Sequence, residues 1–376
     1  MGTWGDCLAI EHCDGALGAA IVPATDKATP GTIMCLAAAW VLGTAWAAPA
    51  QSTLRSQADR HGLLVGCAAW ESGTKGHEPA YTATLAREFN LVATRAQLCT
   101  GVVQPKRGSY RFGEADQVFE FARQHKMKVW GHCLLSSQDN SATLPGWIKD
   151  GRFSREELLA LMREHLHAVI GRYRGRAVAW SVVNEPLKED GFWRRKVGED
   201  WIERALRFAH EADPQASLLL NEFGIERGPK DGGKWRKFYA LVKSMKAEGV
   251  PIHAVGFQSY FDRSTDLADV ASAMKLFADI GIKVHVTELA VLVRTDVPTP
   301  QQLQQQAAVY RSVLKTCLAA PNCEVMTIFG VTDKLHWLVL SGNREAPVLF
   351  DRQYQPKPAY HALLEELTRA GDRQLR

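Results

Sequence analysis

Residues 177–185 read Ala-Val-Ala-Trp-Ser-Val-Val-Asn-Glu, an apolar run that ends in an amide and a carboxylate. Such a run, rich in β-branched residues, is typical of a strand that is buried on both faces. Seven other short runs have the same character. They are Leu63–Trp70, Asn90–Gln97, Lys128–Leu135, Ser217–Phe223, Ala254–Tyr260, Lys283–Ala290 and Val325–Asp333. The sequence therefore predicts eight strands.

Segments with helical spacing separate these runs. In Gly198–Ala212 the apolar residues fall on one face, and Asp213-Pro214 ends the pattern. Glu156–Ile170 and Gln301–Leu318 show similar spacing. Alternating strands and helices indicate a parallel sheet, and eight such units indicate a closed barrel. We therefore predict an α/β protein with a single (β/α)8 barrel.

The alternative architecture is an open, doubly wound sheet. That fold usually has a glycine-rich phosphate-binding loop after its first strand, and this sequence has none there. The chain of 376 residues is 46% hydrophobic and 23% charged, with a net charge of +4. These values suit a globular protein with a sizeable core, and they do not indicate nucleic-acid binding.

The first fifty residues differ from the remainder. Ile33–Ala48 is an alanine-rich apolar run, and Ala45–Ala47 and Ala48–Ala50 both fit the small-x-small pattern of signal cleavage. We interpret residues 1–50 as an extension with an export signal and residues 51–376 as the single barrel domain. The alternatives are a buried helix or an uncleaved anchor. Export predicts a secreted or periplasmic protein without stable membrane association after cleavage.

Export would also permit disulfides. Five cysteines follow residue 50: Cys67, Cys99, Cys133, Cys317 and Cys323. Cys317 and Cys323 flank a short turn that a disulfide could bridge. Because no cysteine or histidine cluster has zinc-binding spacing, we expect no metal site.

Reactive side chains are expected where the strands of such a barrel end, because active sites form at the carboxyl ends of the strands. Several polar residues stand there; they are His132, Asn184, Glu185, Asn221, Glu222, Gln258, Tyr260 and Glu288. Each glutamate could instead cap a helix or pair with an arginine. Two glutamates at strand ends across one barrel mouth, with amides nearby, favour a functional site.

Paired carboxyl groups suit glycoside hydrolysis. One is protonated and donates to the leaving oxygen, and the other is ionised and attacks the sugar or activates water. Trp147, Tyr260, Phe329 and Trp337 stand at the same end and could stack on sugar rings, although each also fits core packing. Asn184 could hydrogen-bond a sugar 2-hydroxyl.

These residues resemble the xylanases of glycoside hydrolase family 10, from about Leu63 to Leu367. The segments that carry the resemblance are Trp180–Pro186, Gly256–Ser259, Val286–Leu289, Phe329–Lys334 with Trp337, Leu349–Asp351 and Tyr354–Tyr360. The resemblance implies that Glu185 is the acid/base, that Glu288 is the nucleophile and that Cys317 bonds to Cys323. It also implies retaining cleavage of internal β-1,4 bonds in a polysaccharide, mostly xylan, with no cofactor.

We expect a monomeric enzyme with a polysaccharide as its partner. The alternative function is a catalytically weak barrel that only binds a glycan. The two glutamates, Asn184 and Gln258 favour the enzyme, because a pure binder needs no acid and nucleophile. A transglycosylase would use the same residues, so the sequence does not separate it from a hydrolase.

The chain departs from the family in the residues that grip the sugar. The segment Arg95–Thr100 replaces the family's glutamate, asparagine and lysine, and Ser136 and Ser137 replace a tryptophan and a histidine. Tyr260 replaces a histidine, and Phe329 replaces a tryptophan.

The planar guanidinium of Arg95 would suit a sugar carboxylate, so one hypothesis is a non-xylan, acidic exopolysaccharide as the substrate. The alternative is that Arg95 pairs with a carboxylate such as Glu222. A further hypothesis places Cys99 and Cys133 at the ends of adjacent strands, joined by a second disulfide.

Overall fold

The computed structural model describes residues 52–70, 74 and 76–370. The predicted export segment, residues 33–48, and the proposed cleavage positions lie outside the described residues. No helix in the described part of the chain is both long and apolar enough to cross a membrane.

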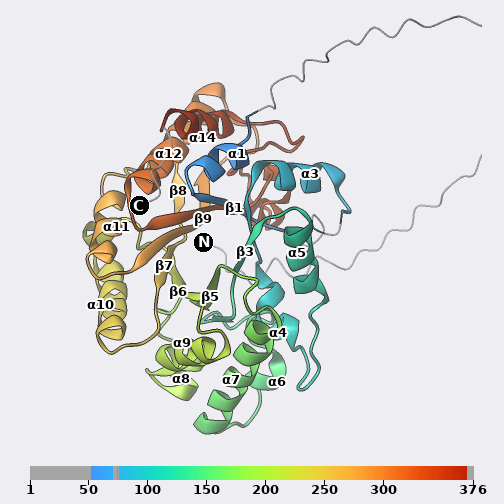
Figure 1. Cartoon of the computed structure of the whole chain (residues 1–376), viewed down its shortest axis with the longest axis vertical. Coiled ribbons are helices and arrows are strands. Elements are labelled where there is room, and N and C mark those ends of the chain that lie inside the picture. The colour runs from blue at the N-terminus through green and yellow to red at the C-terminus, as the bar shows by residue number, and fades with distance from the viewer. Residues whose placement is uncertain (1–51, 71–73, 75, 371–376) are drawn as a thin grey trace, which may run out of the picture.

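Eight parallel strands form the centre of the molecule (Figure 1). They follow the order β10-β1-β2-β3-β5-β6-β7-β9, and β9 also pairs with β10, so the sheet closes into a barrel. The barrel strands are β1 (Leu64–Ala68), β2 (Leu91–Ala93), β3 (Lys128–Gly131), β5 (Ala179–Asn184), β6 (Ser217–Glu222), β7 (Ala254–Phe257), β9 (Lys283–Leu292) and β10 (Cys323–Ile328). The prediction of a single (β/α)8 barrel is confirmed.

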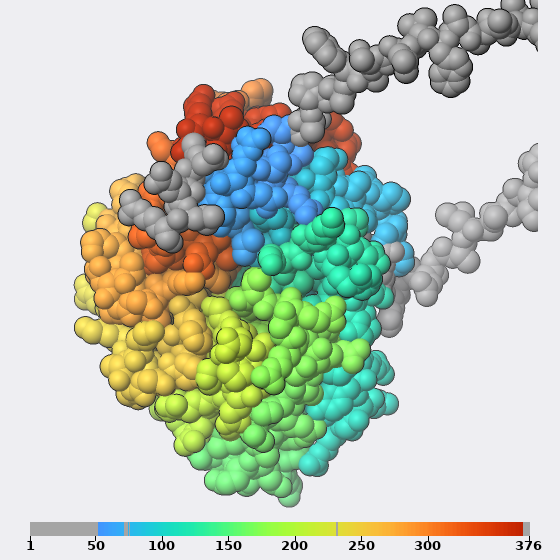
Figure 2. Space-filling model, viewed as in Figure 1, coloured from blue at the N-terminus to red at the C-terminus, as the bar shows by residue number. Residues whose placement is uncertain are grey.

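Helices surround the barrel (Figure 1). The α-helices are α1 (Leu54–Arg60), α3 (Pro79–Glu88), α4 (Thr100–Val103), α5 (Gly113–Gln124), α6 (Gly146–Lys149), α7 (Arg155–Arg172), α8 (Phe192–Val197), α9 (Trp201–Ala212), α10 (Gly233–Ala247), α11 (Val270–Ala278), α12 (Pro300–Ala319), α13 (Trp337–Leu340) and α14 (Pro358–Arg369). The short 3-10 helices are η2 (Ala96–Leu98), η3 (Gly228–Asp231) and η4 (Asp333–Leu335). The first and last described helices, α1 and α14, lie side by side, blue beside red in Figure 2.

Local sequence explains where the long helices begin. Ser154 caps α7 and forms a reciprocal capping box with Glu157, and Thr299 does the same for α12 with Gln302. Pro300 occupies the first position of α12, where its missing N–H costs nothing. The structure joins Cys317, near the end of α12, to Cys323, at the start of β10, in a disulfide.

Two hydrophobic clusters follow from the alternation of side chains along each strand. Leu218 and Leu220 of β6 belong to a large cluster with the helices, whereas Leu219 belongs to a small one. The small cluster draws its other buried residues from strands all round the barrel and from the segment after β10; they are Ala68, Leu91, Ala93, Trp130, Ala179, Ala254, Val325 and Phe329. This cluster fills the barrel interior, so the strands form a rigid support for the residues at their ends.

Several strands end earlier than their sequence pattern predicts. Asn90–Gln97 reads as one strand, but β2 stops at Ala93 and the chain turns into η2, where the Arg95 amide donates to the Gln97 side chain across 2.6 Å. Two short strands, β4 (Leu135–Ser136) and β8 (Tyr260–Asp262), continue the wall beyond the barrel by pairing with β5 and β9. The polar residues of the runs therefore stand at the barrel mouth.

Candidate active site

Two buried glutamates stand at the carboxyl end of the barrel. Glu185 follows β5, and Glu288 lies within β9 with none of its surface exposed. The backbone of Glu185 has a φ of 54°, in the left-handed region that side chains other than glycine rarely adopt. Its amide donates to the carbonyl of Asn221 across 2.7 Å, which holds this conformation. Local strain of this kind clusters at functional sites.

A network of three amides connects the two carboxyl groups. Asn221 Nδ2 donates to Glu288 Oε1 across 2.7 Å and to Asn184 Oδ1 across 2.8 Å. Gln258 Nε2 lies 3.4 Å from the same Asn184 oxygen and 3.3 Å from Glu185 Oε1. The predicted grouping of these five residues is therefore present in the structure.

Gly256 allows this network to pack closely. A Cβ atom at this position would lie 2.3 Å from Asn221 Oδ1 and 2.8 Å from Thr287 Cγ2. Thr287 Oγ1 donates to Asn221 Oδ1 across 2.7 Å, which leaves the amide nitrogen of Asn221 facing Glu288. Any larger residue at position 256 would push Asn221 out of place.

Burial raises the pKa of Glu288 to about 8, and the nearby charge of Glu185 adds to this rise. Hydrogen bonds from Asn221 and Tyr260, and the positive charge of Arg95, act in the opposite direction. These donors selectively stabilise the ionised carboxylate. The ionised form of Glu288 is therefore stabilised by Asn221, Tyr260 and Arg95 against the effect of burial.

His132 lies beside Glu288, with Nε2 3.9 Å from Oε1. Burial, followed by the charge of Arg95, lowers the pKa of His132 to about 3. The imidazole is therefore neutral near pH 7, and the contact is not an ion pair. His132 can contribute hydrogen bonding to the site but no positive charge.

Three of the four predicted aromatic residues gather at the site. Tyr260 Oη donates to Glu288 Oε2 across 3.0 Å, and Trp337 Nε1 donates to Tyr260 Oη across 3.0 Å. The ring of Tyr260 meets Trp337 and Phe329 edge to face, with centroids 6.1 and 6.3 Å apart. These rings form one wall beside Glu288.

The structure does not bring Trp147 to this wall. Its indole nitrogen donates to the carbonyl of Gln104 across 2.9 Å, and its ring packs against Phe153 with centroids 6.3 Å apart. Trp147 lies on α6, where it anchors the segment before α7. The structure therefore places Trp147 apart from the aromatic residues beside Glu288, and its contact with substrate stays a prediction.

The guanidinium of Arg95 lies over an aromatic ring. Its guanidinium carbon is 3.8 Å from the ring centroid of Trp70 and 5.4 Å from that of Phe329. Glu222 pairs instead with Lys234 across 2.9 Å. The proposed Arg95–Glu222 pair is wrong because β2 and β6 are three places apart in the barrel.

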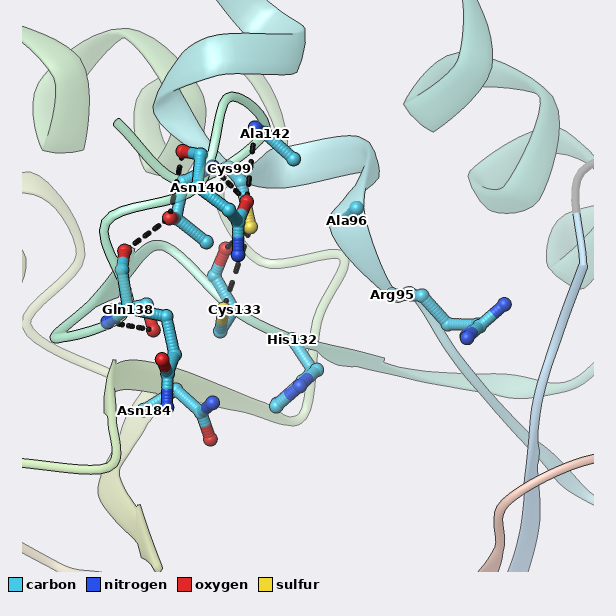
Figure 3. A pocket seen from close by; sticks show the side chains of 11 residues that line it. Arg95, Ala96, Cys99, His132, Cys133, Gln138, Asn140, Ala142 and Asn184 are labelled. Atoms are coloured by element: carbon cyan, nitrogen blue, oxygen red, sulfur yellow. Dashed lines mark hydrogen bonds between the residues drawn. The ribbon is translucent and has the colours of Figure 1, made fainter. Parts of the chain in front are cut away.

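A pocket opens beside these groups (Figure 3). Its lining residues are Arg95, Ala96, Cys99, His132, Cys133, Ser136, Gln138, Asn140, Ala142, Thr143 and Asn184. Figure 3 shows Gln138 beside Asn184 at one end, with Arg95 at the other. The pocket thus runs from Asn184 and from Gln138, whose side chain donates to Glu185, toward Arg95.

The predicted Cys99–Cys133 disulfide is absent from the structure. Both side chains are free thiols, and their sulfur atoms lie 3.4 Å apart, in contact but not bonded. Cys99 Sγ also donates to the carbonyl of Cys133 across 3.3 Å. The prediction placed the two residues correctly, side by side, and was wrong about the bond.

Gln138 is a site residue that the sequence reasoning missed. Its side-chain amide donates to Glu185 Oε2, opposite the oxygen that Gln258 approaches. A polar residue soon after the third predicted strand could have indicated this role. The loop that follows it is longer than in the family pattern, so the sequence did not show where Gln138 would lie. Among the described residues, no group of histidine, cysteine and acidic side chains could hold a metal ion.

Comparisons with known proteins agree with this geometry. The family model described as glycosyl hydrolase family 10 matches residues 53–366. Endo-1,4-beta-xylanase B of Thermotoga neapolitana is 32% identical over 321 residues, which cover 83% of this chain and 90% of that protein. Endo-1,4-beta-xylanase B of Humicola insolens is 37% identical over 289 residues, covering 74% and 78% of the two chains. The crystal structure of xylanase 10B from Thermotoga petrophila RKU-1 in complex with xylobiose has a TM-score of 0.80 at 30% identity, covering 86% of this chain and 99% of that one.

Proposed function

Because this chain belongs to glycosyl hydrolase family 10, we propose that it hydrolyses internal β-1,4 bonds of a xylan-type polysaccharide and retains the anomeric configuration. In this proposal Glu185 is the acid/base and Glu288 is the nucleophile. The observation that carries the proposal is the continuous network from Glu185 through Gln258, Asn184 and Asn221 to Glu288.

The reaction would proceed in two steps. In the first, ionised Glu288 attacks the anomeric carbon, and Glu185 donates a proton to the leaving glycosidic oxygen. In the second, Glu185 removes a proton from water, and the resulting hydroxide displaces Glu288 from the sugar. The first leaving group departs as an alcohol, and Glu185 regains its proton in the second step.

The groups around the two glutamates would favour the first step by stabilising charge on Glu288 and orienting Glu185. Glu288 carries its charge among donors from Asn221 and Tyr260 rather than in water. A buried carboxylate is a stronger nucleophile than a hydrated one, provided that fixed hydrogen-bond donors stabilise its ionised form. Gln138 and Gln258 approach opposite oxygens of Glu185 and fix its orientation.

The choice of polysaccharide is the finer part of the proposal. The relatives named above are xylanases, so xylan is the first substrate to test. The hypothesis of an acidic, non-xylan polymer rests on the replaced residues around Arg95 and stays a prediction. Arg95 lines the pocket, but its guanidinium lies against Trp70, so a sugar carboxylate would have to meet it beside that ring.

Product analysis tests the function. The full chain is incubated with xylan, with mixed-linkage β-glucan and with several acidic exopolysaccharides, and the products are separated by size. Glu288→Ala serves as the inactive variant. Glu222→Gln serves as a matched control, because Glu222 also ends a strand but is held by Lys234. We expect short xylo-oligomers from the wild type and from Glu222→Gln, and none from Glu288→Ala.

The remaining outcomes separate the alternatives. Cleavage of an acidic polymer alone would replace xylan as the substrate but keep the mechanism. Binding without cleavage would favour the glycan-binding barrel, and products longer than the starting oligomers would favour a transglycosylase. Proton NMR of the first products should show the β-anomer, and an initial α-anomer would refute retention.

A further inference from the structure

Cys99 and Cys133 form a thiol pair in the wall of the active-site pocket. Their exposed fractions are 2% and 4%, and their sulfur atoms lie 3.4 Å apart (Figure 3). Cys133 directly follows His132, whose ring lies 3.9 Å from Glu288. The contact with Cys99, burial and the charges of Glu288 and Glu185 all raise the pKa of the Cys133 thiol, so it is protonated at rest. The glycosidase mechanism uses neither sulfur.

The segment that begins at Cys99 supports the loop of residues 138–143. Cys99 is the N-cap of α4, and in the first turn of α4 the amide of Gly101 donates to the carbonyl of Ala142 across 2.7 Å. The contact is tight, because a Cβ atom on Gly101 would lie 1.9 Å from the carbonyl oxygen of Ser141. Any movement of Cys99 toward Cys133 is therefore transmitted to this loop.

The same loop reaches the acid/base candidate. The hydroxyl of Thr143 donates to the carbonyl of Gln138, and the side chain of Gln138 donates to Glu185. Asn140 accepts from the amides of Ala142 and Thr143 across 3.0 and 3.2 Å, which keeps the loop compact. A chain of direct contacts thus runs from the two thiols to Glu185.

We propose that Cys99 and Cys133 are a reversible oxidative modification site for small peroxides, and that a disulfide between them fixes the loop of residues 138–143 and thereby orders the pocket. Two buried cysteines in contact could be no more than small apolar side chains. The shared pocket wall and the contact chain to Glu185 distinguish this pair from Cys67, whose thiol lies against the carbonyl of Ala68 and does not line this pocket.

The chemistry balances with one peroxide molecule. One thiol gives up its proton and its sulfur attacks a peroxide oxygen; the O–O bond breaks, the departing hydroxide takes that proton, and a sulfenic acid and one water form. The second thiol then displaces hydroxide from the sulfenic sulfur, which yields the disulfide and a second water. The pair loses two electrons and two protons, and the peroxide is reduced. Hydrogen peroxide is small enough to suit thiols that are almost fully buried.

Oxidation should have two measurable effects. The bridge would cross-link positions 34 residues apart in sequence, so the melting temperature should rise on the order of 5 °C. Because the pocket wall would be fixed before substrate binds, KM should fall about threefold while kcat stays within about twofold. The kinetic effect rests on the proposed function, whereas the bond and the melting temperature do not.

The test treats the full chain with hydrogen peroxide and labels the remaining thiols at each position, followed by peptide mass spectrometry. Melting temperature and hydrolysis of an aryl β-xylobioside are measured before and after treatment, and again after dithiothreitol. We expect a linked Cys99–Cys133 peptide and both effects, reversed by dithiothreitol. Cys99→Ser should lose the response, and Cys67→Ser should keep it.

Three results would overturn the proposal. Both thiols could stay reduced, or they could be oxidised separately without a link. The link could also form and leave both the melting temperature and KM unchanged. If the proposed glycosidase activity fails, the linked peptide and the melting temperature still decide whether the thiol pair is a modification site. If Cys99→Ser does not fold, the reversal of both effects by dithiothreitol in the wild type decides instead.

Discussion

Tyr260 donates its phenolic proton to Glu288 across 3.0 Å, and the indole of Trp337 donates to the same phenol oxygen across 3.0 Å. Burial and the charge of Glu288 raise the pKa of Tyr260 well above its usual value, so the phenol stays protonated and keeps donating. His132, the other polar neighbour on this side, is neutral. The groups on this side that contact Glu288 directly are thus neutral.

Tyr260→Phe should reduce activity and shift its pH dependence. Because the lost donor favours ionised Glu288, the pKa of Glu288 should rise further above 8, and the acidic limb of kcat/KM should move to higher pH. Losing a hydrogen bond to a charged group should lower kcat/KM about 10- to 100-fold. The measurement is a pH profile with an aryl β-xylobioside.

Tyr310→Phe is the matched control, because the Tyr310 hydroxyl is also buried and donates to the carbonyl of Pro347 across 2.7 Å. Tyr260→His should recover part of the lost activity by restoring a donor. An unchanged acidic limb in Tyr260→Phe would show that this hydrogen bond does not control Glu288.

Glu288→Gln should stabilise the protein at alkaline pH. The folded pKa of Glu288 is about 8 and its ordinary value is 4.5, so the folded state binds this proton more tightly than the unfolded state. The group's contribution to stability is therefore fully present below pH 4.5 and is lost as pH rises through 8. Relative to wild type, the free energy of unfolding of the variant should increase by a few kcal/mol, about 3, between pH 5 and pH 8.5.

Urea unfolding at both pH values measures this difference. Glu345→Gln, at another buried carboxyl group, should show no comparable gain, since Glu345 accepts from the amides of Val293 and Arg294 across 3.0 and 2.8 Å. A gain for Glu288→Gln that is the same at both pH values would mean that side-chain packing, not ionisation, causes it.

The sequence predicted the barrel because its signal is local and repeated. Each strand, such as Ser217–Glu222, is an apolar run with a polar end, and each end must lie at the same side of a parallel barrel. That rule alone places Glu185 near Glu288. The strand limits were less accurate, because residues such as Asp333 continue the apolar pattern while the backbone already turns into η4.

The sequence could not predict which residues the side chains at the barrel mouth contact. Glu222 was considered as a partner of Arg95 but pairs with Lys234, and Trp147 was grouped with the aromatic residues at the barrel mouth but packs against Phe153. Their positions depend on side-chain packing between segments far apart in sequence, which periodicity does not encode. The same limit applies to Gln138, whose loop has no regular pattern, and to the bond state of Cys99 and Cys133.

Gln138→Ala should affect substrates according to their leaving group. Gln138 and Gln258 approach the two oxygens of Glu185, so losing Gln138 should misorient the proposed acid. Departure of a sugar alcohol needs that proton, whereas departure of an activated phenol does not. We expect kcat/KM to fall about 10-fold for xylo-oligomers and less than about 3-fold for a dinitrophenyl glycoside.

Steady-state kinetics with both substrates measure the contrast. Glu185→Ala should show the same contrast more strongly, and Gln353→Ala, at an exposed amide, should show none. Equal losses on both substrates would indicate that Gln138 only supports the loop of residues 138–143.

A buried ion pair lies close in sequence to Trp337, one of the three aromatic residues beside Glu288. Lys357 Nζ lies 3.0 Å from Asp333 Oδ2 and donates to the carbonyl of Ala346 across 2.8 Å, and both charged residues are almost fully buried. Asp333 begins η4, which leads into α13 and Trp337. The pair thus connects the segment before α14 to the donor that contacts Tyr260.

Lys357→Met should leave Asp333 buried without its partner. Removing one member of a buried pair typically costs about 3–5 kcal/mol of unfolding free energy. Lys283→Met is the matched control, because its pair with Glu324 is half exposed and should be worth about 0–1 kcal/mol. Adding Asp333→Asn to Lys357→Met should recover part of the loss, since the uncompensated charge disappears. Urea unfolding of the four proteins measures these values, and an equal cost for the two lysine variants would mean that Asp333 finds another partner or water.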